Sequence, residues 1–316
     1  MSFSQDIKEE LEKQAGQARH CRLAELATIL LCYAAEEVLA DGTKSLVIVT
    51  EHETIVRKYF TLLKKAFNIE NGLFDGGEPC ERTNALVEGR IVGQENYKEM
   101  LQALKMWDDE REEFAAGKKV SNLLLKTSCC RRAFLRGCYL CIGSMSDPQK
   151  GYHLEFLCNN PEFAGQIVDI LSGFGIEGRT MLRRKYHVVY IKESEAISEL
   201  LNIMEAHVGL MNYENTRILK EIGNQINRKA NFEAANIIKS VNTANKQIAD
   251  IEYISKKKGL DYLPENLRIM AEIRLEHPEE SYQELGAFFD PPIGKSGVNH
   301  RLRKIGEIAE KLRTFD

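Results

Sequence analysis

The sequence has no hydrophobic run long enough to cross a membrane. Its longest apolar stretch, Leu26–Ala35, is far shorter than the roughly 20 residues that a bilayer-spanning helix needs. Prolines number only 7, and 43% of the residues are apolar, so neither a disordered chain nor a fibrous repeat is indicated. The charged segment 1–10 is unlike an export signal. We therefore expect a soluble, cytoplasmic, nucleoid-associated protein with no membrane partner.

The chain also lacks the evenly spaced cysteines of a secreted disulfide framework. Its 8 cysteines lie mostly in or beside apolar segments or form the doublet Cys129 and Cys130, so we interpret them as reduced thiols. Cys138 and Cys141 have zinc-like spacing, but no second Cys or His pair matches them, and core packing is the better interpretation. We expect no metal ligand and no small-molecule cofactor.

Neither an excess of positive charge nor a catalytic motif is present. A net charge of -4 excludes a protein that coats nucleic acid by bulk attraction, so DNA binding would have to come from local patches. No Walker loop or nucleophile elbow occurs. The segment Gly173–Gly178 has the spacing of a dinucleotide fingerprint, but it follows a predicted helix and precedes a predicted strand, which is the wrong order for that site.

What the sequence does contain is an internal duplication. The first round consists of a helix, a strand, a helix, a hairpin with strands at 85–87 and 90–92, and a helix, at 22–35, 46–50, 53–67, 71–93 and 97–107. The second round repeats this order at 132–143, 152–158, 162–172, 180–191 and 194–206. A repeat of this size predicts a duplicated α+β domain over 1–207, with repeats at about 21–107 and 130–207. A polar, basic helical linker follows at 208–260.

The opening helix of each round resembles a degenerate copy of the LAGLIDADG motif of homing endonucleases, at Leu26–Ala34 and Leu135–Gly143. In that family two such helices pack side by side, and an acid at the eighth motif position of each holds a divalent metal. The eighth positions here are Tyr33 and Ile142, which offer no carboxylate to a hard cation. The resemblance thus implies a domain that has lost its catalytic acids. A displaced acid, Asp147 or Glu36, and core helices of another α+β fold stay open as alternatives.

In the LAGLIDADG fold the hairpins form a saddle that lies on DNA. The second hairpin is basic, whereas its counterpart in the first repeat carries Glu78, Glu81 and Glu88, which argues against a symmetric saddle. A secondary DNA or partner patch is one interpretation of the basic residues of the hairpin and the linker: Arg179, Arg183, Arg184, Lys185, Arg228 and Lys229. The alternative is a solvated hairpin tip, which is the commoner role of such basic runs.

The last segment, 261–316, predicts an all-α helix-turn-helix domain. Ser281 and Glu284 have the spacing of a capping box that opens a helix over 282–289, and the prolines after Asp290 end it. Ser296 is the predicted cap of a second helix. Its buried stripe is expected to contain Val298, Leu302, Ile305 and Leu312.

The charge pattern of this second helix favours DNA recognition. No Asp or Glu occurs between Lys295 and Lys304, although a helix start ordinarily favours acids. Removing the buried stripe leaves four candidates for reading bases: Ser296, Asn299, His300 and Arg303. Three residues are expected to contact phosphates: Lys295, Arg301 and Lys304. A solvated surface helix is the alternative interpretation.

The whole chain resembles the WhiA family of bacterial sporulation and cell-division regulators, which joins a degenerate LAGLIDADG domain to a helix-turn-helix. The most specific segments are Phe134–Gly137, Tyr152–Phe156, Asn227-Arg228 and Pro291–Ile305. The resemblance implies a sequence-specific regulator of transcription, sporulation and cell division that is not an enzyme, with double-stranded DNA and the transcription machinery as partners. A still-active metal-dependent endonuclease and a protein-interaction scaffold with weak DNA contact remain open.

Overall fold

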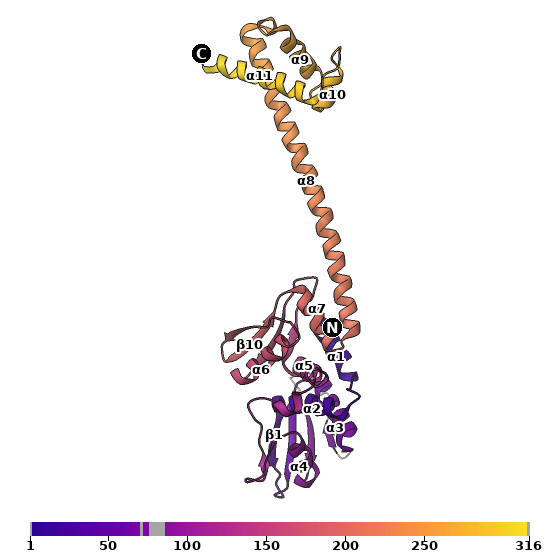
Figure 1. The fold of residues 1–316 in the computed structure, drawn as a ribbon. Helices are drawn as coiled ribbons and strands as arrows, with labels where there is room; N and C mark the ends of the chain where they lie inside the picture. The colour runs from indigo at the N-terminus through magenta and orange to yellow at the C-terminus, as the bar shows by residue number, and fades with distance from the viewer. Residues whose placement is uncertain (1, 70–71, 76–85, 315–316) are drawn as a thin grey trace. The chain divides into compact units, whose positions relative to one another are not determined.

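The structure, a computed structural model, describes residues 2–69, 72–75 and 86–314. The chain divides into two compact units, Met1–Lys220 and Glu221–Asp316 (Figure 1). No helix in these described ranges is long and apolar enough to span a membrane.

The first unit contains the duplication that the sequence predicts. Its first repeat runs through α2 (Arg19–Tyr33), β1 (Ala34–Val38), β2 (Lys44–Thr50), α3 (Glu53–Phe67), β3 (Gly72–Asp75), β4 (Val87–Val92) and α4 (Gln94–Ala103). The second runs through α5 (Ser128–Ile142), β7 (Gly143–Met145), β8 (Leu154–Cys158), α6 (Pro161–Ser172), β9 (Arg179–Arg183), β10 (Tyr186–Ile191) and α7 (Ser194–Ile203). The antiparallel sheets have matching orders, β1-β2-β4-β3 and β7-β8-β10-β9. The predicted α+β fold class is confirmed.

Three details of the predicted elements were wrong. Strands β1 and β7, which directly follow the LAGLIDADG-like helices, were missed because they are polar or very short and exist only through pairing with β2 and β8. The hairpin is formed by β3 and β4, so its first strand is β3 and Val87 already belongs to its second strand. Residue 85 of the predicted first strand lies outside the described residues. Helix α4 ends at Ala103 because Lys105 is left-handed, with φ 60°, and Met106 N donates to the Leu101 carbonyl.

The shorter elements of this unit are α1 (Phe3–Lys13), β5 (Trp107–Asp108), β6 (Glu113–Phe114) and the 3-10 helix η1 (Asn122–Leu125). Helices α2 and α5 lie so close that a Cβ on Gly137 would be 3.0 Å from Thr28 Cβ. A buried ion network joins them to α3. Glu25 Oε1 lies 2.9 Å from Lys58 Nζ and 3.1 Å from Arg136 Nε, and all three side chains are almost completely buried. Glu25 is thus shared by two buried cations, and Arg136 Nη1 also lies 2.9 Å from a second acid, Glu205 Oε2.

The second unit has its own apolar core. It is built from the end of α8 (His207–Lys258), η2 (Leu260–Tyr262), α9 (Glu265–Glu276), α10 (Tyr282–Ala287) and α11 (Lys295–Thr314). Ile251 and Ile254 of α8 pack with Met270 of α9, Leu285 of α10 and the buried stripe of α11. That stripe contains Val298, Leu302 and Ile305 as predicted, with Ala309 fully buried in the last turns and Leu312 only partly buried.

Candidate nucleic-acid interface

Helices α10 and α11 form the helix-turn-helix, and local hydrogen bonds fix its geometry. Ser281 N donates to Glu284 Oε2 at 2.8 Å and Glu284 N donates to Ser281 Oγ at 3.4 Å, so the predicted capping box is present. Helix α10 ends at Ala287, earlier than the predicted residue 289. The chain then returns to α10, where Ile293 N donates to the Gly286 carbonyl oxygen at 3.0 Å. This bond sets the turn between the two helices.

Helix α11 begins before Ser296, the residue that the sequence predicts as its N-cap. Ser296 lies inside the first turn, since the helix starts at Lys295 and Val298 N already donates to the Gly294 carbonyl. The predicted capping role of Ser296 is therefore wrong, because the helix begins two residues earlier than a cap at Ser296 would place it. The hydroxyl lies on an exposed residue of the turn. No acid lies in this turn.

The four candidates for base reading are all exposed on α11. Asn299 and Arg303 also line a groove of about 630 Å³ between α11 and the end of α8. Arg303 Nε lies 3.3 Å from Glu307 Oε1, and the Arg303 side chain keeps 70% of its accessible surface. An exposed pair of this kind contributes only about 0.3 to 0.5 kcal/mol. Arg303 can therefore leave Glu307 for a stronger acceptor at little cost.

The three phosphate candidates differ in their surroundings. The Arg301 guanidinium lies 4.6 Å from the ring centroid of Phe289, a cation–π contact that leaves the side chain half-buried. Lys295 lines a second groove, of about 470 Å³, beside α8 and the start of α10. Lys304 is exposed.

The basic hairpin of the second repeat is partly neutralised by its own acids. Arg183 Nη2 lies 2.7 Å from Glu155 Oε1, and Arg179 Nε lies 3.2 Å from Glu177 Oε1. Arg184 sits at the left-handed turn between β9 and β10 with φ 57°. The remaining members of the predicted patch are exposed: Lys185 in the hairpin, and Arg228 and Lys229 on α8.

The corresponding face of the first repeat is acidic where the structure describes it. Arg90 contacts two glutamates, with Nη2 lying 2.9 Å from Glu37 and 2.6 Å from Glu88. Glu78 and Glu81, which the sequence analysis counted with Glu88, lie outside the described residues. The described part of this face thus offers a phosphate little net positive charge.

The two positions that hold catalytic acids in homing endonucleases have structural contacts here. Tyr33 Oη donates to the Cys141 carbonyl oxygen at 2.7 Å, which ties the end of α2 to α5, and burial raises the pKa of Tyr33 above its usual range. Ile142 is the last residue of α5. Glu36, one of the displaced acids, accepts a hydrogen bond from Tyr97 Oη at 2.5 Å. Asp147 accepts from Gln149 N at 2.9 Å and thereby shapes a turn.

Comparison with known proteins now decides the family. The WhiA LAGLIDADG-like domain matches residues 131–223, and the WhiA C-terminal HTH domain matches residues 226–309. A protein of Lachnoclostridium phytofermentans named "Probable cell division protein WhiA" is 47% identical over 99% of this chain and 100% of its own. The chain belongs to the WhiA family. A relative of the same name from Alkaliphilus oremlandii is 42% identical over 99% of this chain and 98% of its own.

The fold of this WhiA-family chain is also found in a solved structure. The crystal structure of full-length WhiA from Thermatoga maritima has a TM-score of 0.55 to this chain. Its sequence is 24% identical, and the match covers 98% of this chain and 99% of that one. The predicted combination of a LAGLIDADG-like domain and a helix-turn-helix is confirmed.

Sequence reasoning missed the part of α8 that faces α11. Lys246 and Gln247 line the same groove as Asn299 and Arg303, and Gln247 Nε2 donates to Tyr282 Oη at 2.6 Å. A signal was available, since Lys239 and Lys246 are spaced by two helical turns and so fall on one face of a WhiA linker helix. A positive side chain thus stands across the groove from Arg303.

Proposed function

We propose that this chain is a sequence-specific DNA-binding regulator of transcription that serves sporulation and cell division and does not cut DNA. The observation that carries the proposal is the exposed, acid-free start of α11 on a capped helix-turn-helix. A negative backbone approaching this helix meets Lys295, His300 and Lys304 without an opposing carboxylate. The name of the Lachnoclostridium relative, a cell division protein, supports the cellular role.

In this proposal Arg303 and Asn299 read base edges, while Lys304 and Arg301 contact phosphates. An arginine can donate two parallel hydrogen bonds to guanine, and an asparagine can pair with adenine. The protein then acts in the cytoplasm at the nucleoid. Contact with the transcription machinery is the remaining part of the proposal, and the exposed hairpin and linker patches are the surfaces available for it.

The division of roles on α11 is tested by fluorescence anisotropy with genomic fragments and scrambled controls. Arg303→Ala is expected to cost about 1 to 3 kcal/mol on the specific site and to relax base preference. Lys304→Ala is expected to weaken binding to all sequences alike and to reduce the slope of log affinity against log salt concentration by about one. Arg303→Lys is the matched control, since it keeps the charge but loses the paired donors. Equal losses from Arg303→Ala and Lys304→Ala would contradict the assignment.

The contact between Arg303 and Glu307 gives a second test, in which a substitution is expected to strengthen DNA binding. Glu307→Gln removes the acid that competes with DNA for Arg303. Because an exposed pair of this kind contributes about 0.3 to 0.5 kcal/mol, binding should tighten by about twofold. Weaker binding by this variant would show that Glu307 orients Arg303 productively.

The proposed absence of nuclease activity rests on the two former acid positions. Tyr33 binds a backbone carbonyl, and Ile142 has no metal ligand. Supercoiled DNA incubated with the full chain and Mg²⁺ or Mn²⁺ is expected to stay intact. Nicking that is lost on Asp147→Ala would instead assign cleavage to a displaced acid.

A further inference from the structure

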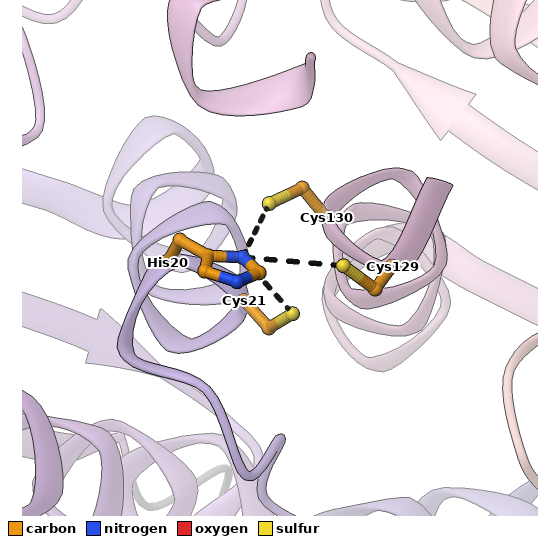
Figure 2. Close-up of side chains that lie close together, drawn as sticks. All are labelled: His20, Cys21, Cys129 and Cys130. Carbon is orange, nitrogen blue, oxygen red and sulfur yellow. Dashed lines mark hydrogen bonds between the residues drawn. The ribbon is translucent and has the colours of Figure 1, made fainter. Parts of the chain in front are cut away.

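Four potential metal ligands meet at the start of the two LAGLIDADG-like helices. Figure 2 shows His20 and Cys21 of α2 facing Cys129 and Cys130 of α5. The Nδ1 atom of His20 lies 3.1 Å from Cys130 Sγ, 3.4 Å from Cys21 Sγ and 4.0 Å from Cys129 Sγ. All four ligand atoms lie within 4.8 Å of one another. No other group of three or more His, Cys, Asp or Glu among the described residues is arranged in this way.

The duplication of the domain places these ligands. His20 and Cys129 are separated by 109 positions, as are Cys21 and Cys130, and the same spacing relates the first residues of α2 and α5. Each doublet therefore occupies the second and third positions of its helix. Because the two helices pack side by side, equivalent positions of the two repeats face each other, and each repeat supplies half of the cluster.

The donor set is that of a structural zinc site. Three thiolates and one imidazole nitrogen are a known tetrahedral combination for Zn²⁺, with bonds of about 2.3 Å to sulfur and about 2.0 Å to nitrogen. Those bond lengths require nitrogen-to-sulfur separations of roughly 3.5 Å. The three separations measured from His20 Nδ1 bracket that value, and all four ligand atoms lie within 4.8 Å of one another, so side-chain adjustments of about one ångström or less would close the site around an ion.

The N-termini of two helices meet at this place. Neither α2 nor α5 has a side-chain cap or an acid in its first turn, so the positive ends of both helix dipoles face the sulfurs without competition. Cys21 and Cys130 are buried, whereas His20 and Cys129 are exposed and leave a route for an ion. Thr127 Oγ1 lies 3.3 Å from Cys129 Sγ and supports that ligand from outside.

We propose that His20, Cys21, Cys129 and Cys130 bind one zinc ion that clamps the first turns of α2 and α5 together. On binding, the three thiols release their protons to solvent, and no oxidation occurs. Four protein ligands leave no open position for substrate, so the site is structural. It lies at the opposite end of these helices from Tyr33 and Ile142, the positions at which homing endonucleases hold their cleavage metals. The proposal replaces the sequence expectation that the chain has no metal ligand.

The test begins with the full chain expressed in zinc-supplemented medium and purified under reducing conditions. Elemental analysis is expected to find one zinc per chain. Replacement with Co²⁺ is expected to give the thiolate charge-transfer and visible bands of a tetrahedral sulfur-rich site, a measurement that needs no variant. Chelation is expected to lower the melting temperature reported by Trp107 fluorescence, since Trp107 belongs to the first unit and is the only tryptophan.

Substitutions test which residues bind the ion. Cys129→Ser and Cys21→Ser are expected to lose the zinc and the cobalt bands, whereas Cys32→Ser on the same α2 helix, outside the cluster, keeps both. A wild-type chain without zinc that also gives no tetrahedral cobalt spectrum would overturn the proposal. So would zinc retained by a folded Cys21→Ser, Cys129→Ser double variant. A disulfide between Cys21 and Cys129 in the reduced, metal-supplemented protein would assign the cluster to redox chemistry instead.

Discussion

Replacing Gly286 with alanine is expected to disrupt the helix-turn-helix while leaving the first unit folded. Gly286 lies in α10 beneath the returning chain, and its carbonyl accepts the hydrogen bond from Ile293 N. A Cβ at this position would come closer than 3.0 Å to the Ile293 carbonyl oxygen and within 3.4 Å of Val298 Cγ2. The nearest atom belongs to the backbone, so the turn itself must move.

The size of the effect follows from two opposing contributions. Carbon and oxygen atoms in proteins ordinarily stay about 3.3 Å or more apart, so the turn would have to shift by on the order of 1 Å. Overpacking of this kind costs about 1 to 3 kcal/mol, and a backbone clash belongs at the upper end of that range or beyond it. The gain in helix propensity from glycine to alanine is at most about 1 kcal/mol. We therefore expect the free energy of unfolding of the second unit to fall by about 2 kcal/mol or more, which lowers the ratio of folded to unfolded protein by at least about 20-fold.

The assay is hydrogen exchange followed by mass spectrometry on the full chain, combined with the anisotropy measurement. Amides of α10 and α11 should exchange faster in Gly286→Ala, and specific DNA binding should be lost. The transition of Trp107 fluorescence should stay unchanged, because Trp107 lies in the other unit. Gly297→Ala is the matched control, since its Cβ would lie 3.7 Å from Ile293 Cβ in ordinary contact. That variant should be neutral or up to about 1 kcal/mol more stable.

Wild-type protection of α10 and α11 in Gly286→Ala, together with wild-type DNA affinity, would refute this prediction. That result would mean that the turn tolerates an added methyl group at its closest approach. The clash, and with it the importance of the Ile293 hydrogen bond, would then have been misjudged.

Glu25→Gln is expected to destabilise the first unit by about 3 to 5 kcal/mol in urea unfolding, since the buried Lys58 and Arg136 lose a shared counter-charge. A loss under about 1 kcal/mol would show that the network contributes little. Burial raises the pKa of Glu155, but hydrogen bonds from Arg183 and a neighbouring histidine outweigh it and leave the pKa below its ordinary 4.5. The contribution of ionised Glu155 to the free energy of unfolding is therefore present above pH 4.5 and lost as the pH falls through the pKa of Glu155 in the folded protein. Glu155→Gln should accordingly flatten the acid side of the curve of stability against pH. An unchanged acid slope in that variant would exclude this carboxylate as the cause.

Local sequence patterns predicted most of the helices and longer strands. The periodicity of 53–67 gave helix α3 with its observed bounds, and the Ser281 and Glu284 pair gave the capping box that opens α10. Such signals succeed because a cap or an amphipathic helix is decided by residues within a few positions of one another. The missed β1 strand shows the limit, since its polar residues are held in a sheet only by their pairing with β2.

The sequence by itself determined the duplication, the loss of the acids at Tyr33 and Ile142, and the acid-free start of α11. Only the tertiary structure decided that Tyr33 ties α2 to α5, that Arg303 shares a groove with Lys246, and that His20 meets Cys129 across 109 positions. The physical reason is that these meetings depend on how whole helices pack. Helix packing is fixed by close approaches such as that of Gly137 to Thr28, which no local pattern of residues encodes.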